Sequence, residues 1–183
     1  MNLIKTHIAG VYSIKNSISH DNRGTFSRLF CRIELKELLE GKEISQVNRS
    51  ITHKSGTIRG MHYQKAPFAE IKIIQCIKGR VYDVALDLRK NSETYLQWAS
   101  IELGENSFDG FVIPEGCAHG FQTIEENSEL IYFHTAPYAP EAEAGVRYDD
   151  PELKISWPVP ISDISQRDLL HPFIGKNFKG III

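Results

Sequence analysis

The 183-residue sequence has no long hydrophobic run, few cysteines and no excess of positive charge. No segment is both apolar and long enough to act as a signal peptide or to span a bilayer, so we expect a cytoplasmic protein without membrane contact. The formal net charge is −2, which argues against the broad basic face that nucleic-acid binding requires. A small anionic ligand remains compatible with this charge.

The three cysteines are Cys31, Cys76 and Cys117, which lie far apart and form no CxxC pair. An odd number at this spacing disfavours both a disulfide framework and a zinc site. We therefore expect reduced, mostly buried thiols and assign them no function.

Helical periodicity is also scarce. Only Glu34–Glu40 carries leucines three and four residues apart, and it ends at Gly41, so we predict one short helix there. Asn16–Gly24 is predicted to be a polar loop, and the remaining segments alternate with period two between turn signals. Strands are predicted at Val11–Ile14, Thr25–Arg32, Ser45–Ile51, Thr57–Gln64, Ile71–Ile77, Arg80–Leu88, Tyr95–Leu103, Ser107–Ile113, Phe121–Ile124 and Leu130–Ala136.

Many short strands with almost no helix predict an all-β sandwich or closed barrel, and the jelly roll is the favoured form. Beyond Pro137 the chain becomes irregular, and its prolines exclude central strands, so this tail could lie over the barrel mouth. We find no internal repeat and no linker, so residues 1–183 are expected to form a single domain.

Two histidines stand beside glycine in segments with strand character. His62 lies in Arg59-Gly60-Met61-His62-Tyr63-Gln64, and His119 lies in Pro114-Glu115-Gly116-Cys117-Ala118-His119-Gly120-Phe121. Glycine at these places predicts a backbone that is bent or closely approached, with each imidazole held at a chosen position. A lone strand histidine is more often structural than basic, so only a combination of groups predicts chemistry.

Strand parity predicts which side chains share a cavity. Asp83 lies on the face of its strand opposite the apolar residues around Val84, Lys72 shares a face with Ile74, and Tyr132 shares one with His134. If the polar faces line one cavity, that cavity can take a proton, give one and stabilise an anion. Its members would be His62, Lys72, Asp83, His119 and Tyr132.

Five segments follow one another in a fixed order, namely Arg59–Gln64, Gly79–Arg89, Ile113–Phe121, Tyr148–Pro151 and Trp157–Pro158. Together they resemble the dTDP-4-dehydrorhamnose 3,5-epimerase family. The resemblance runs from about Arg23 to Asp168 and implies a cupin-type jelly roll, a homodimer with some strand exchange, and no metal or organic cofactor. It implies a nucleotide-linked 4-keto-6-deoxyhexose as substrate, with conversion of dTDP-4-dehydro-6-deoxyglucose to dTDP-4-dehydro-L-rhamnose as the first choice.

The resemblance also implies a role for each polar residue. His62 would be the base, with Asp168 bonded to its far nitrogen. Lys72 would stabilise the enolate oxygen, and Tyr132 would return the proton from the opposite face. The implied substrate-binding residues are Arg59, Asp83 and His119 around the sugar or supporting the base, and Arg23, Gln46, Asn48, Glu143 and Arg167 around the nucleotide diphosphate.

Three other readings stay open. Arg28, Ser19 and Val47 depart from the family pattern, so a relative that epimerises only C3 or only C5, or takes another deoxysugar, also fits. A metal-dependent cupin oxygenase or isomerase would need a second histidine in the first cupin motif, where Gln64 is a poor metal ligand. A catalytically silent sugar-nucleotide binding module would not need a matched acid and base.

Overall fold

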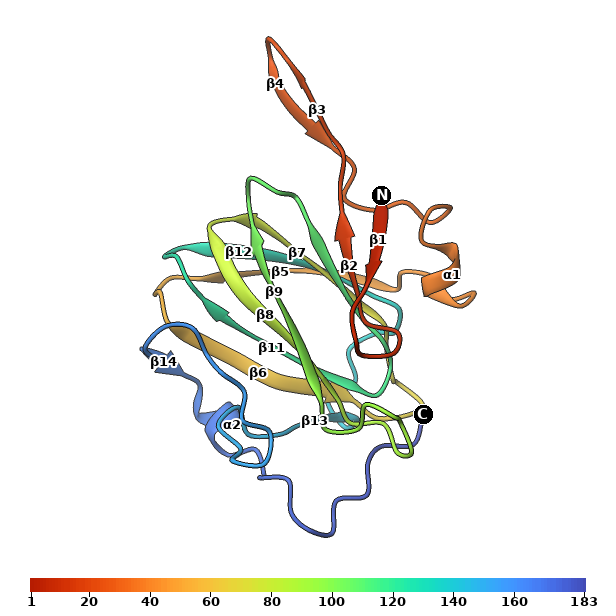
Figure 1. Cartoon of the computed structure of the whole chain (residues 1–183), viewed down its shortest axis with the longest axis vertical. Helices are drawn as coiled ribbons and strands as arrows, with labels where there is room; N and C mark the ends of the chain where they lie inside the picture. The colour runs from red at the N-terminus through yellow and green to blue at the C-terminus, as the bar shows by residue number, and fades with distance from the viewer.

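The computed structural model describes residues 1–183 and is built almost entirely of antiparallel strands in two facing sheets (Figure 1). The first sheet has the order β1 (Asn2–Lys5), β2 (Tyr12–Lys15), β10 (Gly110–Ile113), β7 (Lys72–Lys78), β12 (Ser128–His134) and β5 (Gln46–Thr52). The second has the order β13 (Glu143–Gly145), β6 (Thr57–Gln64), β11 (Cys117–Thr123), β8 (Arg80–Asp87) and β9 (Trp98–Gly104). The predicted all-β, cupin-type jelly roll is confirmed.

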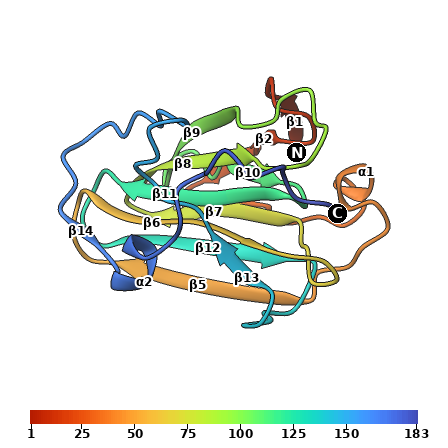
Figure 2. The ribbon, with the colours of Figure 1, turned by 90° about the horizontal axis from the view of Figure 1, so that it is seen from below.

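Five short elements lie outside these two strand orders. The hairpin of β3 (Ile18–Asp21) and β4 (Gly24–Ser27) extends away from the body of the molecule (Figure 1). The helix α1 (Lys36–Leu39) follows it, and β14 (Asp163–Ile164) pairs in parallel with β6. The helix α2 (Gln166–Leu169) lies alongside β6 (Figures 1 and 2). Neither helix has the length and apolar character of a membrane span.

The core has three parts because both sheets are covered on their outer faces as well as their inner ones. The cluster between the sheets includes Val81, Ala85 and Phe111. Val84 and Leu86 lie on the opposite face of β8 from Val81 and Ala85, and they pack outward beneath the C-terminal tail. A third cluster joins the helical segment to the outer face of the first sheet. The predicted parity of β8 is therefore confirmed.

Several predicted boundaries were wrong. The strand predicted at Thr25–Arg32 ends at Ser27, and the predicted loop Asn16–Gly24 contains β3. Both strands of this hairpin are largely exposed, so neither face needs the apolar alternation that identifies a half-buried strand. The predicted helix is only four residues long, and β11 begins at Cys117, so His119 lies inside a strand.

The tail does more than cover the barrel mouth. Its first part, including α2, borders the cavity described below, whereas later residues such as Ile174 and Phe178 pack on the outer face of the second sheet. The sequence analysis missed β1, β13, β14 and α2, which have two to four residues each. Elements of this length are too short to show a period.

The glycines beside the two histidines sit where β6 and β11 approach each other closely. A Cβ atom on Gly60 would lie 2.5 Å from Gly120 Cα, and Gly60 has a φ of +133°. A Cβ atom on Gly120 would lie 2.5 Å from Met61 Sδ. The predicted close backbone approach is confirmed at both positions, and it brings the two histidine-bearing strands together.

Candidate active site

A cavity of about 770 Å³ lies between the two sheets. Its walls come from β5, β7 and β12 of the first sheet, β6 and β11 of the second, and the segment around α2. Nine of the twelve residues predicted from the sequence line it, namely Asn48, Arg59, His62, Lys72, His119, Tyr132, Glu143, Arg167 and Asp168.

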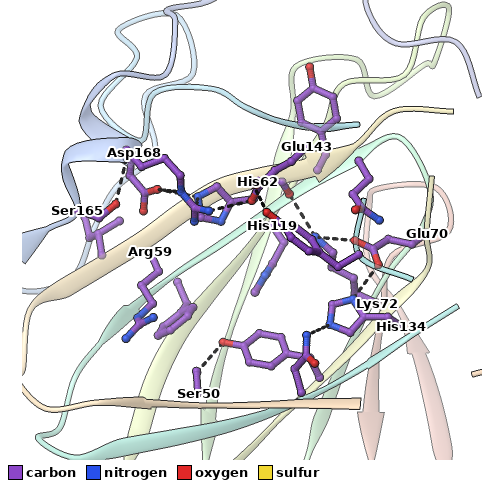
Figure 3. A pocket seen from close by; sticks show the side chains of 18 of the residues that line it. Ser50, Arg59, His62, Glu70, Lys72, His119, His134, Glu143, Ser165 and Asp168 are labelled. Atoms are coloured by element: carbon purple, nitrogen blue, oxygen red, sulfur yellow. Dashed lines mark hydrogen bonds and ion pairs between the residues drawn. The ribbon is translucent and has the colours of Figure 1, made fainter. Parts of the chain in front are cut away.

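His62 and Asp168 form a hydrogen-bonded pair at one side of the cavity (Figure 3). His62 faces the cavity because its neighbours Met61 and Tyr63 point to the outer cluster, as strand alternation requires. His62 Nε2 lies 2.8 Å from Asp168 Oδ1, and Asp168 Oδ2 accepts the backbone N–H of Gly60 at 3.1 Å. With Nε2 held by the carboxylate, Nδ1 is the nitrogen left to exchange a proton.

Asp168 is placed by the start of α2. Its backbone N–H donates to the side chain of Ser165, which caps the helix, and the residue is only 2% exposed. Burial alone would raise the pKa of this carboxyl, but the hydrogen bonds from His62 and Gly60 outweigh it and hold the pKa well below its usual value. Asp168 therefore stays ionised and stabilises a positive charge on the imidazole.

His119 forms a second histidine–aspartate pair next to the first. It lies directly across from His62 in the register of β11 and β6, and its Nε2 is 2.9 Å from Asp83 Oδ1. Burial raises the pKa of Asp83 by more than the charge of His119 lowers it, and Asp83 Oδ2 has no partner. Asp83 lies behind His119 and does not line the cavity, so it supports this histidine and does not touch a ligand.

Tyr132 lies on the facing sheet, on β12. Its hydroxyl group is 2.9 Å from Ser50 Oγ, and its ring centroid is 6.0 Å from that of His119. Burial raises the pKa of Tyr132 far more than Ser50 lowers it, so the phenol keeps its proton at neutral pH. The cavity thus has an imidazole on one wall and a protonated phenol on the other.

Lys72 lies at the start of β7 and is 9% exposed. Its Nζ is 3.3 Å from Glu70 Oε1 and 3.5 Å from the backbone carbonyl of His62. The other oxygen of Glu70 accepts a hydrogen bond of 2.7 Å from His134 Nδ1. Although burial raises the pKa of Glu70, His134 and Lys72 together hold it below its usual value, so the carboxylate is charged.

Two exposed arginines add positive charge where the cavity opens to solvent. Arg59 donates to the carbonyl of Ile51 at 3.1 Å, and Arg167 pairs with Glu143 at 3.0 Å. Guanidinium groups bind phosphate oxygens through paired donors. This end of the cavity is therefore suited to a diphosphate.

Besides Asp83, two predicted binding residues do not reach the cavity. Arg23 lies on the β3–β4 hairpin, where it pairs with Asp21 and its side chain is 85% exposed. Gln46 lies two residues before Asn48 on β5 and does not line the cavity. Its Nε2 donates a hydrogen bond of 3.1 Å to Asn48 Oδ1. Within one chain, Arg23 therefore lies away from the cavity, and Gln46 is connected to it only through its hydrogen bond to Asn48.

The ligand atoms of His62, Asp168 and His171 all lie within 4.8 Å of one another, so this group could hold a metal ion. The guanidinium of Arg167 lies 3.4 Å from Asp168 Oδ1 and 3.4 Å from His62 Nε2, and this positive charge opposes a cation there. Gln64, at the second place of the first cupin motif, uses its amide for three hydrogen bonds to backbone groups. Its amide oxygen is therefore committed elsewhere.

The sequence analysis missed Ser50, Glu70 and His171 as site residues. Ser50 and Glu70 line the cavity, and His171 packs edge-on against His62 with ring centroids 5.4 Å apart. Ser50 could have been found by strand alternation, since it lies two residues after Asn48 on the same face of β5. Glu70 precedes its strand and His171 follows a short helix, so no period marks them.

Comparison with known proteins gives one consistent result. The family model described as dTDP-4-dehydrorhamnose 3,5-epimerase matches residues 5–176. A protein of that name from Sinorhizobium fredii is 36% identical over 166 residues, 90% of this chain and 85% of its own length.

Two solved structures are also similar. The Legionella pneumophila dTDP-6-deoxy-D-glucose-3,5-epimerase in complex with dTDP-4-keto-L-rhamnose has a TM-score of 0.91 and 32% identity, covering 100% of this chain and 98% of its own. A 3′-monoepimerase from Streptomyces bikiniensis, in complex with dTDP-quinovose, has a TM-score of 0.85 and 29% identity, covering 92% of this chain and 85% of its own. On the family match and the Sinorhizobium relative, this chain belongs to the dTDP-4-dehydrorhamnose 3,5-epimerase family.

Proposed function

We propose that the protein epimerises a nucleotide-linked 4-keto-6-deoxyhexose at C3 and C5, converting dTDP-4-dehydro-6-deoxyglucose to dTDP-4-dehydro-L-rhamnose. The observation that carries the proposal is that His62 and Tyr132 border the same cavity from opposite sheets. A sugar ring between them would meet a base on one face and an acid on the other. That arrangement is what inversion of a carbon centre requires.

The reaction begins at a hydrogen made acidic by the C4 carbonyl. His62 takes this proton on Nδ1, the C–H electron pair moves toward the carbonyl, and an enolate forms with its charge on O4. Asp168 stabilises the resulting imidazolium through its 2.8 Å contact with Nε2. Tyr132 then donates its proton to the carbon from the opposite face, and the configuration is inverted.

Lys72 is the proposed electrophile for the enolate oxygen. An ammonium that is 9% exposed acts in a region of low dielectric constant, where charge stabilisation is strongest. The nucleotide diphosphate is proposed to bind at the open end of the cavity near Arg59 and Arg167, with Glu143 and Asn48 completing that end. His119 would contact the sugar, and Asp83 would hold His119 in place.

The test is incubation with dTDP-4-dehydro-6-deoxyglucose in deuterated water, followed by location of deuterium by NMR. The proposal predicts deuterium at both C3 and C5 together with inversion at both centres. A His62→Asn variant serves as the matched control, because it removes the base with little loss of volume. No exchange with wild-type protein, or undiminished exchange with the variant, would contradict the proposal.

A second candidate function is epimerisation at one centre only. The similarity to a 3′-monoepimerase at a TM-score of 0.85 favours it, because the two chains share most of their backbone. The same deuterium experiment separates the two functions. Label and inversion confined to C3 would support the monoepimerase.

A homodimer is proposed from the position of the β3–β4 hairpin. Arg23 cannot serve the cavity of its own chain, and Phe26 at the same hairpin is 74% exposed. A hairpin inserted into a second copy would bury Phe26 and bring Arg23 to that copy's diphosphate. Light scattering after size-exclusion chromatography should give about twice the mass of 20.8 kDa, and a monomer would refute this part.

Two simpler points complete the proposal. The chain is taken as one domain, since both sheets combine strands from its first and second halves. A cytoplasmic location is proposed from the three free cysteines, which form no disulfide.

A further inference from the structure

Glu70 is a buried carboxylate shared by two cationic or potentially cationic groups. It precedes β7 by two residues, and Lys72 and His134 are register partners on β7 and β12. Figure 3 shows Glu70 between these two side chains, joined to each. The proposed mechanism uses Lys72 but assigns no role to Glu70 or His134.

The two contacts of Glu70 differ in length. His134 Nδ1 lies 2.7 Å from Oε2, whereas Lys72 Nζ lies 3.3 Å from Oε1. A charged N–H donor normally sits about 2.7–2.9 Å from a carboxylate oxygen. The histidine contact is therefore of full strength, and the lysine contact is stretched.

The protonated nitrogen of His134 can be assigned from a chain of hydrogen bonds that starts at a backbone group. The N–H of Tyr138 donates to Gln46 Oε1 at 3.0 Å, which identifies the other end of that amide as the donor. Gln46 Nε2 then donates to Asn48 Oδ1 at 3.1 Å, which leaves Asn48 Nδ2 to donate to His134 Nε2 at 3.5 Å. With Nε2 as the acceptor, Nδ1 carries the proton that is donated to Glu70.

Lys72 keeps donors free because its partners are few and distant. An ammonium has three N–H donors, and Lys72 has two protein partners, at 3.3 Å and 3.5 Å. The group is nevertheless buried, so its remaining donor capacity is available to an oxygen inside the cavity. A negatively charged substrate oxygen next to Lys72 Nζ would therefore be strongly stabilised by the ammonium charge.

We infer that His134 is a positioning residue that acts through Glu70: by holding Oε2 it keeps the carboxylate off Lys72 and leaves the ammonium free for the substrate oxygen. This inference rests on the proposed function. Without the histidine, the only charged partner left to the buried carboxylate is Lys72. A buried carboxylate with a single cationic partner closes onto it, and the resulting ion pair weakens the field at the substrate.

The test uses two substitutions of nearly equal shape. His134→Asn keeps an N–H donor close to the position of Nδ1, whereas His134→Leu removes it. We expect His134→Leu to lower kcat about 10- to 100-fold, since loss of one oxyanion donor costs about 100- to 1000-fold and quenching is only partial. KM should change less than about twofold, and His134→Asn should recover most of kcat.

A second pair of variants separates positioning from general structural damage. In a Glu70→Gln background there is no negative charge to quench Lys72, so adding His134→Leu should lower kcat by less than about threefold. Thermal unfolding of each variant checks folding. His53→Leu is the matched control, because the imidazole of His53 hydrogen-bonds to Asn127 at 3.1 Å and does not line the cavity.

A crystal structure of His134→Leu gives a result that does not depend on turnover. The contact between Glu70 and Lys72 should shorten from 3.3 Å toward about 2.8 Å. An unchanged distance, or an equal kcat loss in the Glu70→Gln background, would overturn the inference. If wild-type protein fails to exchange substrate hydrogens, the proposed function fails, and the distance alone still decides whether His134 holds the carboxylate away.

Discussion

Replacing Asp168 by asparagine should disable the base by changing which nitrogen of His62 carries the proton. Asp168 accepts its two shorter hydrogen bonds from His62 Nε2 at 2.8 Å and from the Gly60 N–H at 3.1 Å, and a longer one from Arg167 Nε at 3.4 Å. Asparagine offers one oxygen and one NH2 group to these two donors. If the oxygen stays with Gly60, the NH2 group faces His62, Nε2 must accept, and the proton moves to Nδ1, where the base should be free.

The size of the effect follows from the cost of the opposite orientation. Turning the oxygen toward His62 leaves the buried N–H of Gly60 without an acceptor, at about 1–3 kcal/mol. Loss of the negative charge weakens the bond to the imidazolium by about 1 kcal/mol more. Together these terms give about 2–4 kcal/mol, so kcat should fall about 30- to 1000-fold.

The assay is the rate of deuterium incorporation from solvent, with KM measured in parallel. KM should stay within about threefold, because the substitution is isosteric. Asp149→Asn is the control, since Asp149 also pairs with an arginine but lies outside the cavity. A kcat within threefold of wild type, or a loss confined to KM, would refute the argument about the tautomer.

Three further predictions concern the acid, the strand crossing and acid stability. Tyr132→Phe should abolish inversion while His62 still exchanges the substrate hydrogen, so NMR should find deuterium with retained configuration; inversion at the wild-type rate would remove Tyr132 as the acid. Gly60→Ala should lower the unfolding free energy, measured by urea titration, by about 3 kcal/mol, because the new Cβ would lie 2.5 Å from Gly120 Cα and Gly60 has a φ of +133°. The control is Gly175→Ala, which should change the unfolding free energy little because nothing lies within 4 Å of its Cβ. Burial raises the pKa of Asp87, but the hydrogen bonds from Arg89, Ser92 and Thr94 outweigh burial and lower the pKa to about 2. The stability that ionised Asp87 contributes to the fold is therefore present above about pH 4 and is lost as the pH falls toward 2. The difference in unfolding free energy between wild type and Asp87→Asn should therefore become smaller as the pH falls over that range. A difference that stays constant would show that the lowered pKa of Asp87 does not stabilise the fold.

The parts of the fold that the sequence predicts well are those with a buried face. The strands β6, β7, β8 and β12 show period two because one face packs on the core while the other meets the cavity or the outer clusters. The β3–β4 hairpin has no buried face, so the order of its polar and apolar residues does not show where its strands begin and end, and their predicted bounds were wrong. Prediction failed where burial does not constrain the side chains.

The candidate site divides in the same way. His62, Lys72 and Tyr132 lie on long strands, so the alternation of side chains predicts which face of its strand each one occupies, and the structure brings these faces to one cavity. Arg23 was assigned from resemblance alone, and in a single chain it points to solvent on an exposed hairpin. Glu70 precedes its strand and belongs to no periodic pattern, so only the structure, through its place in the cavity wall and its contacts with His134 and Lys72, identifies it as part of the site.

The two histidine–aspartate pairs also explain which imidazole is suited to be the base. They lie side by side in register and have nearly equal lengths, 2.8 Å for His62 and 2.9 Å for His119. Their carboxylates differ: the pKa of Asp168 is lowered, whereas burial raises the pKa of Asp83.

The cause of the difference is local. The second oxygen of Asp168 accepts the N–H of Gly60, whereas the second oxygen of Asp83 has no partner. A carboxylate that keeps its charge stabilises an imidazolium, and one that is reluctant to ionise does so poorly. The surroundings therefore favour His62 over His119 as the group that gains a proton in the proposed reaction. Exchange that survives in His62→Asn but disappears in a His119→Asn variant with unchanged KM would reverse this assignment.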